Sequence, residues 1–209
     1  FLLTRTSDDR KGGITILLVP MDTPGITVRN IPSLIGEGDI HEVFFDDVTV
    51  PVTARLGEEG QAWDIVAYSL RNERLGIPRF YLARAALDRA VAMLKAAGDF
   101  ASPTVRAEAA RCAGLCEAAG TASYAVVQKR VDGLQIGAES SSARYATIMA
   151  ERAVVEFVIE FVPEALANAS PYLKMHHQRG IVAGIAAGAA EIQLNIIASE
   201  VLGLPREPR

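Results

Sequence analysis

The stretch from residue 57 to residue 79 most constrains the fold, because the chain changes character across it. Before this stretch, short apolar runs alternate with turn residues, a pattern typical of strands. After it, apolar residues recur at helical spacing over long segments. The stretch itself opens with a glycine-rich acidic turn and then places apolar residues on one side of a helix, at Trp63, Val66, Ala67 and Leu70. It therefore predicts a junction between a strand-rich and a helical part.

The residues before the junction predict four strands, over residues 1–6, 14–19, 26–31 and 42–50. Glycine, proline and acidic residues separate these runs, and we expect a further loop at residues 36–39. Short turns between consecutive strands favour antiparallel pairing. Residues 1–56 therefore predict part of an antiparallel β-barrel or sandwich.

The residues after the junction predict a helical domain over residues 57–209, and the fold class is mixed but mainly α. The helix that begins near Trp63 should break or kink at Pro78, and Pro163 should kink a later one. We expect Ser102 to be an N-cap and Pro103 to lie in a first turn. Four long helices joined by short loops, over residues 80–97, 104–131, 139–169 and 189–201, predict an antiparallel four-helix bundle.

Composition and charge exclude several classes of function. Of the 209 residues, 50% are hydrophobic but only 6% are aromatic, which suits closely packed helices, and the net charge of −4 leaves no basic surface for nucleic acid. No run of about 18 apolar residues predicts a membrane helix. Cys112 and Cys116 are interpreted as buried reduced thiols, which fits a cytoplasmic protein. His176 and His177, expected in a loop, have too few neighbouring ligands for a metal site, so none is predicted.

Glu73 is the main candidate for chemistry within the junction. Leu70, Leu75 and Ile77 flank it, and an apolar setting would raise the pKa of its carboxyl towards neutrality, as suits a general base. A structural ion pair or a solvent-facing glutamate remains the alternative. Adjacent helical residues do not face one another, so Glu73 need not pair with Arg74.

Residues 57–74 resemble the junction between the middle β-domain and the C-terminal helical domain of flavin-dependent acyl-CoA dehydrogenases. Residues 13–21 and 42–51 resemble that family's β-domain, and residues 191–198 and 202–205 its last helix. The resemblance implies an acyl-CoA thioester as substrate, FAD as cofactor and an electron-transferring flavoprotein as acceptor. It also implies that the chain is a piece of a longer protein, with a helical domain and the first β-strands preceding it.

The resemblance further implies roles for individual residues. In this family a glutamate removes the α-proton while the β-hydrogen leaves as hydride to the flavin. Most members place that base before a Gly-Thr near the last helix, where this chain reads Ala187-Gly188-Ala189. The isovaleryl-CoA and long-chain types place it in a Glu-Arg pair on the first helix of the C-terminal domain. By this likeness Glu73 is the base, Arg74 binds substrate, and the cofactor-binding residues are Ala187, Gly188, Ala189 and Glu191.

Two departures from the family pattern leave alternatives open. Ala189 replaces a threonine that contacts flavin, and residues 96–100 replace an Arg-x-x-Phe-Gly motif that reaches the partner subunit's flavin. A kept base with lost flavin contacts suits heteromeric members, several of which act on steroid side-chain thioesters. The alternatives are a non-catalytic subunit that scaffolds an active sibling, and a flavin-free thioester-binding or hydratase-like protein.

The pattern of small residues predicts assembly. Alanine and glycine are frequent within residues 104–131 and again within 181–190, and residues 139–169 carry a broad apolar stripe. One bundle cannot bury all of these faces. We therefore expect a homo-oligomer, or a hetero-oligomer with a sibling acyl-CoA dehydrogenase subunit. The alternative is that the N-terminal domain implied by the resemblance covers the same faces within one chain.

Overall fold

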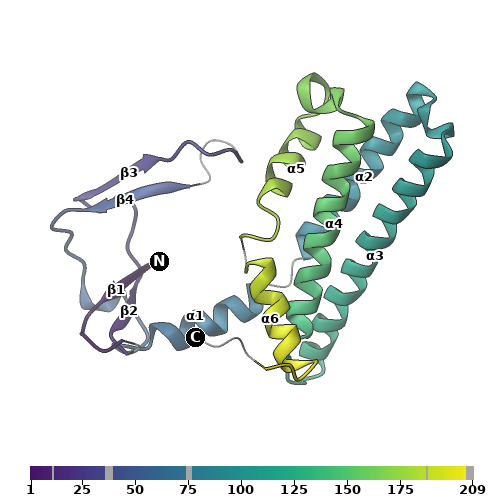
Figure 1. Ribbon diagram of the computed structural model, residues 1–209. Coiled ribbons are helices and arrows are strands. Elements are labelled where there is room, and N and C mark those ends of the chain that lie inside the picture. Colours follow the sequence, from purple (N-terminus) through teal and green to yellow (C-terminus); the bar gives the residue numbers. More distant parts are fainter. Residues whose placement is uncertain (11, 36–39, 74–76, 187, 206–209) are drawn as a thin grey trace. The chain divides into compact units, whose positions relative to one another are not determined.

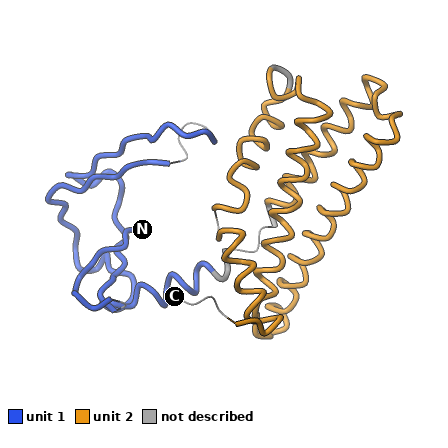
Figure 2. The backbone as a smooth tube through the Cα atoms, in the orientation of Figure 1, with its two compact units in different colours: residues 1–73 blue, residues 74–209 orange. Residues whose placement is uncertain are grey.

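The computed structural model describes residues 1–10, 12–35, 40–73, 77–186 and 188–205, with the backbone alone at 71–73, 77–78 and 168–169. The chain forms two compact units, residues 1–73 and residues 74–209 (Figure 2). The predicted loop at 36–39, Arg74 and Ala187 lie outside the described residues. The division at residues 56 and 57 that we expect from the sequence stays a prediction about the domains.

The first unit contains two small antiparallel sheets. One sheet has the order β1 (Leu2–Arg5), β2 (Ile14–Leu17) and β5 (Arg55–Leu56), and the other pairs β3 (Ile26–Asn30) with β4 (His41–Phe45). Ile16 and Thr15 of β2 are buried, so the core of this unit lies at β2. The described residues form no closed barrel. The helix α1 (Ala62–Glu73) completes the unit and contacts β2.

The fourth strand is shorter than the sequence predicts. It ends at Phe45 instead of residue 50, and β5 was missed. The amide of Asp46 still donates to the main-chain oxygen of Gly25 at 2.9 Å, and the chain then turns at Asp47, which adopts a positive φ of 47°. That turn ends the pairing of β4 with β3.

The second unit is helical. Its helices are α2 (Ile77–Ala97), α3 (Pro103–Val131), α4 (Glu139–Phe161), α5 (Pro171–Ile181) and α6 (Ala190–Glu200). Helix α4 contacts each of the other four, and it runs alongside α3 and α5 in Figure 1. The core between α2, α3, α4 and α5 consists mainly of alanine, valine and leucine, with the two cysteines and one buried aromatic side chain, Phe157. Such small side chains let the helix backbones approach closely.

The prediction of one helix over residues 139–169 is wrong. Helix α4 ends at Phe161, because Val162 precedes Pro163 and a residue before proline is driven out of the helical region. Val162 accordingly has φ −141° and ψ 45°. A short π-helical turn at Ala165–Ala169 follows, and then α5 begins at Pro171.

Helix α5 also corrects the expectation that His176 and His177 lie in a loop, because both lie within this helix. The Oγ of Ser170 accepts a hydrogen bond from the amide of Leu173 at 3.3 Å and so caps the helix, with Pro171 as its first residue. Ser102 likewise precedes α3, but its side chain makes no capping bond.

The apolar stripe on α4 is covered by helices of the same chain. Val154, Val155 and Val158 are all buried, which leaves Ile159 as the exposed member of the stripe. The stripe therefore no longer supports a subunit interface, and the prediction of an oligomer depends on the small residues within 104–131 and 181–190.

Candidate functional site

The predicted base ends a helix. Glu73 is the last residue of α1, and the structure describes its backbone but not its side chain. It belongs to the first unit, whereas Gly188, Ala189 and Glu191 belong to the second. Of the four predicted cofactor residues, the three that the structure describes thus lie together at the start of α6.

The segment before α6 has a backbone that requires glycine. Gly188 adopts a positive φ of 100°, and a Cβ added there would overlap Nε2 of Gln193. Ala189 occupies the N-cap position of α6 without a side-chain cap, and Glu191 is exposed in the first turn. The backbone at the start of α6 therefore stands close to the side chain of Gln193.

Gln193 was missed by the sequence analysis. Its side chain is only 2% exposed, and its Nε2 has no hydrogen-bond acceptor among the residues that the structure describes. Side chains on a helix point back towards its N-terminus, and the closeness of Nε2 to Gly188 fits that direction. A buried amide donor without an acceptor is costly, so it marks a place where a ligand with oxygen atoms would be stabilised. A glutamine inside the apolar run 192–197 was the available signal.

Two arginines of α4 hold the segment between α5 and α6. Arg144 donates from Nη2 to the main-chain oxygen of Ala186 at 2.8 Å, and Arg152 donates from Nε and Nη2 to that of Ala183 at 3.1 and 2.9 Å. The amide of Ala190 in turn donates to the main-chain oxygen of Gly184 at 2.8 Å. The first turn of α6 is thereby connected to α4 through main-chain oxygens.

A buried carboxylate lies close to Arg144. Glu151, also on α4, is 5% exposed and lies 3.6 Å from Nη1 of Arg79 on α2 and 3.8 Å from Nη1 of Arg144. Burial raises the pKa of Glu151 above its ordinary value, while the positive charges of Arg79 and Arg144 act in the opposite direction. Charge pairing thus links α2 to α4 inside the helical unit.

The histidines of α5 and the two cysteines of α3 lie inside the helical unit. Among the described residues no group of three metal-ligating side chains comes together. Burial, and to a lesser extent the charge of His177, lowers the pKa of His176 to about 4, so its imidazole is neutral near pH 7. Cys112 and Cys116 are free and buried, and burial raises the pKa of both thiols. These groups belong to the core.

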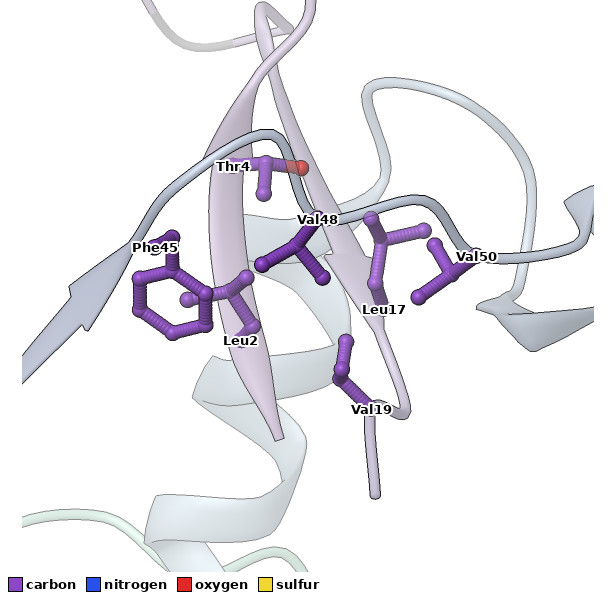
Figure 3. A pocket seen from close by; sticks show the side chains of 7 residues that line it. All are labelled: Leu2, Thr4, Leu17, Val19, Phe45, Val48 and Val50. Atoms are coloured by element: carbon purple, nitrogen blue, oxygen red, sulfur yellow. The ribbon is translucent and has the colours of Figure 1, made fainter. Parts of the chain in front are cut away.

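The first unit contains an apolar pocket of about 320 Å³ (Figure 3). Its one polar lining side chain, Thr4, already donates to the main-chain oxygen of Thr15 at 3.2 Å. The pocket has no group for chemistry and can only hold an apolar side chain or molecule. Its lining residues come from β1, β2 and the segment around the end of β4: Leu2, Thr4, Leu17, Val19, Phe45, Val48 and Val50.

Comparison with known proteins identifies the family. The model of the acyl-CoA dehydrogenase C-terminal domain matches residues 60–202. This chain belongs to the acyl-CoA dehydrogenase family. The match includes Glu73 and the whole segment from α2 to α6, so the helical unit is the family's C-terminal domain.

Relatives of this acyl-CoA dehydrogenase family member include mycobacterial proteins. The acyl-CoA dehydrogenase FadE34 of Mycobacterium tuberculosis is 28% identical over 209 residues, which are 98% of this chain and 29% of FadE34. IpdE1 of the same organism is also 28% identical, over 100% of this chain and 56% of IpdE1. The chain thus spans between about a third and somewhat more than half of these relatives.

Solved structures of the family share the fold. A probable acyl-CoA dehydrogenase from Mycobacterium abscessus superposes with a TM-score of 0.85 and 27% identity, over 95% of this chain and 55% of that one. The ChsE4–ChsE5 complex from Mycobacterium tuberculosis also gives a TM-score of 0.85, at 23% identity. No helix in the described part of this chain is long and apolar enough to cross a membrane.

Proposed function

We propose that this chain is part of an FAD-dependent acyl-CoA dehydrogenase that introduces a trans α,β double bond into an acyl-CoA thioester. The observation that carries the proposal is the family match over residues 60–202, which includes both places where the family keeps its base. Only one of them has a carboxylate in this chain, Glu73, because the other reads Ala187-Gly188-Ala189. We therefore assign the base to Glu73 and substrate binding to Arg74.

The chemistry asked of Glu73 is proton removal. Its carboxylate takes the proton from the α-carbon of the thioester while the β-hydrogen departs with two electrons, which leaves a carbon–carbon double bond. Bound FAD supplies the acceptor for that hydride. The electrons then pass to an electron-transferring flavoprotein. Glu73 lies at the end of α1 rather than in a loop, so its backbone has a fixed helical conformation.

The start of α6 fits a flavin cofactor. The amide of Ala190 already donates to the main-chain oxygen of Gly184. The amides that follow it in the first turn have no intrahelical acceptor and carry a partial positive charge, which favours phosphate and carbonyl oxygen atoms. Gly188 lets the backbone pass close by, and the unpartnered Nε2 of Gln193 is a further donor. Ala189 adds no hydroxyl. We propose that Ala187, Gly188, Ala189 and Glu191, with Gln193, contact FAD through backbone and amide donors.

A second candidate is a non-catalytic subunit that scaffolds an active sibling. It is favoured by Ala189 and by the fold shared with the ChsE4–ChsE5 complex, which contains two different subunits. In either case we propose a homo- or hetero-oligomer. We further propose that the complete protein closes the two small sheets into the family's barrel or sandwich, and that its helical unit is an antiparallel four-helix bundle.

Replacing Glu73 by Gln separates the two candidates. In the full protein with its partner subunits, we expect the Gln variant to lose about 10²–10⁴-fold in turnover of acyl-CoA with a dye acceptor. It should equally lose the exchange of the thioester's α-protons with deuterium oxide, a readout that needs no electron acceptor. FAD content should stay at the wild-type level.

The matched control is Glu58→Gln, which removes an exposed carboxylate that pairs with Arg55 in the same unit. We expect it to keep both activities. The scaffold reading instead requires that Glu73→Gln leave turnover and proton exchange unchanged. If the wild-type assembly contains no FAD in its absorption spectrum, both candidates give way to a flavin-free function.

A further inference from the structure

Three charged side chains connect the first turns of α2 to the segment before α6. Glu151 lies between two guanidinium groups, that of Arg79 at 3.6 Å and that of Arg144 at 3.8 Å. Arg144 extends the series, because its Nη2 donates to the main-chain oxygen of Ala186. Arg79 is the third residue of α2 and follows Glu73 closely in the sequence. In the sequence, the series therefore begins shortly after Glu73 and ends shortly before Gly188.

The burial of this series is not explained by stability. Arg144 is 1% exposed and Glu151 is 5% exposed. Removing two charges from water costs more than a weakly directed ion pair returns, and well-packed apolar side chains in their place are often as stable or more so. Both separations exceed hydrogen-bond length, and Glu151 Oε2 accepts no hydrogen bond from the described residues. The series instead fixes the position of one main-chain oxygen, that of Ala186.

Backbone hydrogen bonds shape the segment from 182 to 186 locally, from the amide of Ala183 to the oxygen of Gly180 at 3.1 Å and from that of Ile185 to the oxygen of Val182 at 3.0 Å, but these bonds do not join it to α4. Ala183 and Gly184 are buried but small, and a Cβ added to Gly184 would lie 2.7 Å from Nη2 of Arg152. Ile185 is 68% exposed. Apolar side chains therefore contribute little anchoring here, and the polar contacts from α4 hold the turn that leads into α6.

We propose that Arg79, Glu151 and Arg144 form a positioning triad that sets the place of residues 182–186, and through them of Gly188 and the first turn of α6, for the cofactor. The inference rests on the proposed function, in which FAD contacts this turn. The triad touches neither substrate nor cofactor. It acts through the main-chain oxygen of Ala186, and Arg152 reinforces it at Ala183.

The decisive variant removes both buried charges at once, and the guanidinium of Arg79, which then loses its ion pair with Glu151, is partly exposed to water. Glu151→Gln alone leaves the buried guanidinium of Arg144 without its counter-charge and risks misfolding. The double variant Arg144→Met/Glu151→Leu fills the same space with apolar side chains and keeps the unit folded. It lacks the bond to Ala186. Glu117→Gln, which removes an exposed partner of Arg84, is the matched control.

Amide hydrogen exchange and flavin affinity are then measured on the full protein in its native assembly. In the folded double variant we expect amides of residues 182–193 to exchange about tenfold faster or more, and the dissociation constant of FAD to rise about tenfold or more. Exchange in α3 should not change. Glu117→Gln should match the wild type in both measurements.

One result would overturn the inference: a double variant that is as stable as the wild type against denaturant and that keeps wild-type amide exchange and wild-type FAD affinity. The three side chains would then only fill space in the core. Failure of the inference is distinguishable from failure of the proposed function. If the wild-type assembly takes up no FAD, the proposed function is wrong, and so is the statement that the triad positions the segment for a cofactor. Exchange at residues 182–193 still decides whether the triad holds the segment.

Discussion

The guanidinium of Arg144 donates a hydrogen bond to the main-chain oxygen of Ala186 at 2.8 Å, although all of α5 separates the two residues in the sequence. A buried guanidinium requires polar partners, and Arg144 finds them in that oxygen and in the carboxylate of Glu151. The consequence is that a turn of small residues is fixed on α4 by polar contacts. This contact therefore also helps to fix the position of the start of α6.

Gly180 should be intolerant of any side chain. It lies in α5, and an added Cβ would overlap Cγ2 of Val155 on α4. We expect Gly180→Ala to lower the free energy of unfolding by about 1–3 kcal/mol through overpacking. In a Val155→Ala background the same change should cost much less, because the space is then open. Urea unfolding of the four proteins measures this coupling.

Gly114→Ala is the matched control for Gly180. Gly114 lies in α3, and an added Cβ there would meet nothing within 4 Å. Alanine forms helix more readily, so we expect a gain of about 0.5–1 kcal/mol. A loss of stability at Gly114 would contradict the open surface that the structure gives it, and would place this face of α3 in a contact with another subunit.

The two thiols should be unreactive in the native protein. Cys112 and Cys116 are at most 2% exposed, and burial raises the pKa of Cys116 to about 11. Since the thiolate is the reactive form, we expect labelling by a disulfide reagent at pH 8 to be at least ~100-fold slower than in denaturant. Both thiols should react fully once the protein unfolds. Fast labelling of one thiol before unfolding would show that α3 opens locally.

Local sequence signals placed the long helices well. The predicted end of α2 at residue 97 and of α3 at residue 131 agree with the structure, because Gly98 and Gly133 adopt positive φ angles just beyond them. Pro163 ended a helix where we expected a kink. Ser170 and Pro171 carried the start signal of α5, but the long apolar run before them masked it.

The polar residues of the helical core were not predictable in the same way. Arg144 and Glu151 lie two turns apart on one helix, and their spacing alone does not reveal that both are buried. Gln193 likewise becomes informative only once its burial is known. Burial of a polar side chain is a property of tertiary packing, whereas helix ends are set by neighbours in the sequence.

His176 should make the protein less stable in mild acid. Its folded pKa is about 4, well below the ordinary value of 6.5, because burial disfavours the imidazolium. Between these values the unfolded chain binds a proton that the native chain does not, so stability is lost as the pH falls. Lowering the pH from 7 to 5 should therefore cost the wild type about 2 kcal/mol through this residue.

His176→Leu provides the comparison for that titration. We expect the variant to lose about 2 kcal/mol less than the wild type over the same pH interval, measured by urea unfolding at each pH. Other groups, including Glu151, whose raised pKa acts with the opposite sign, are common to both proteins and cancel in the difference. Equal pH dependence in the two proteins would mean that His176 is protonated in the native state.

Gln193 offers a prediction in which stability and cofactor binding change in opposite directions. Its Nε2 is buried beside Gly188 without an acceptor among the described residues, so Gln193→Met removes an unsatisfied donor while nearly keeping the volume. We expect the free energy of unfolding of the FAD-free protein to stay equal or to rise by about 1 kcal/mol. If Nε2 donates a hydrogen bond to the cofactor as proposed, the dissociation constant of FAD should rise about tenfold, as measured by the fluorescence of released flavin.

Gln128→Met is the control, since Gln128 donates to Asp132 on the exposed side of α3. Unchanged FAD affinity together with raised stability would mean that Gln193 does not contact the cofactor and that its buried amide only destabilises the core.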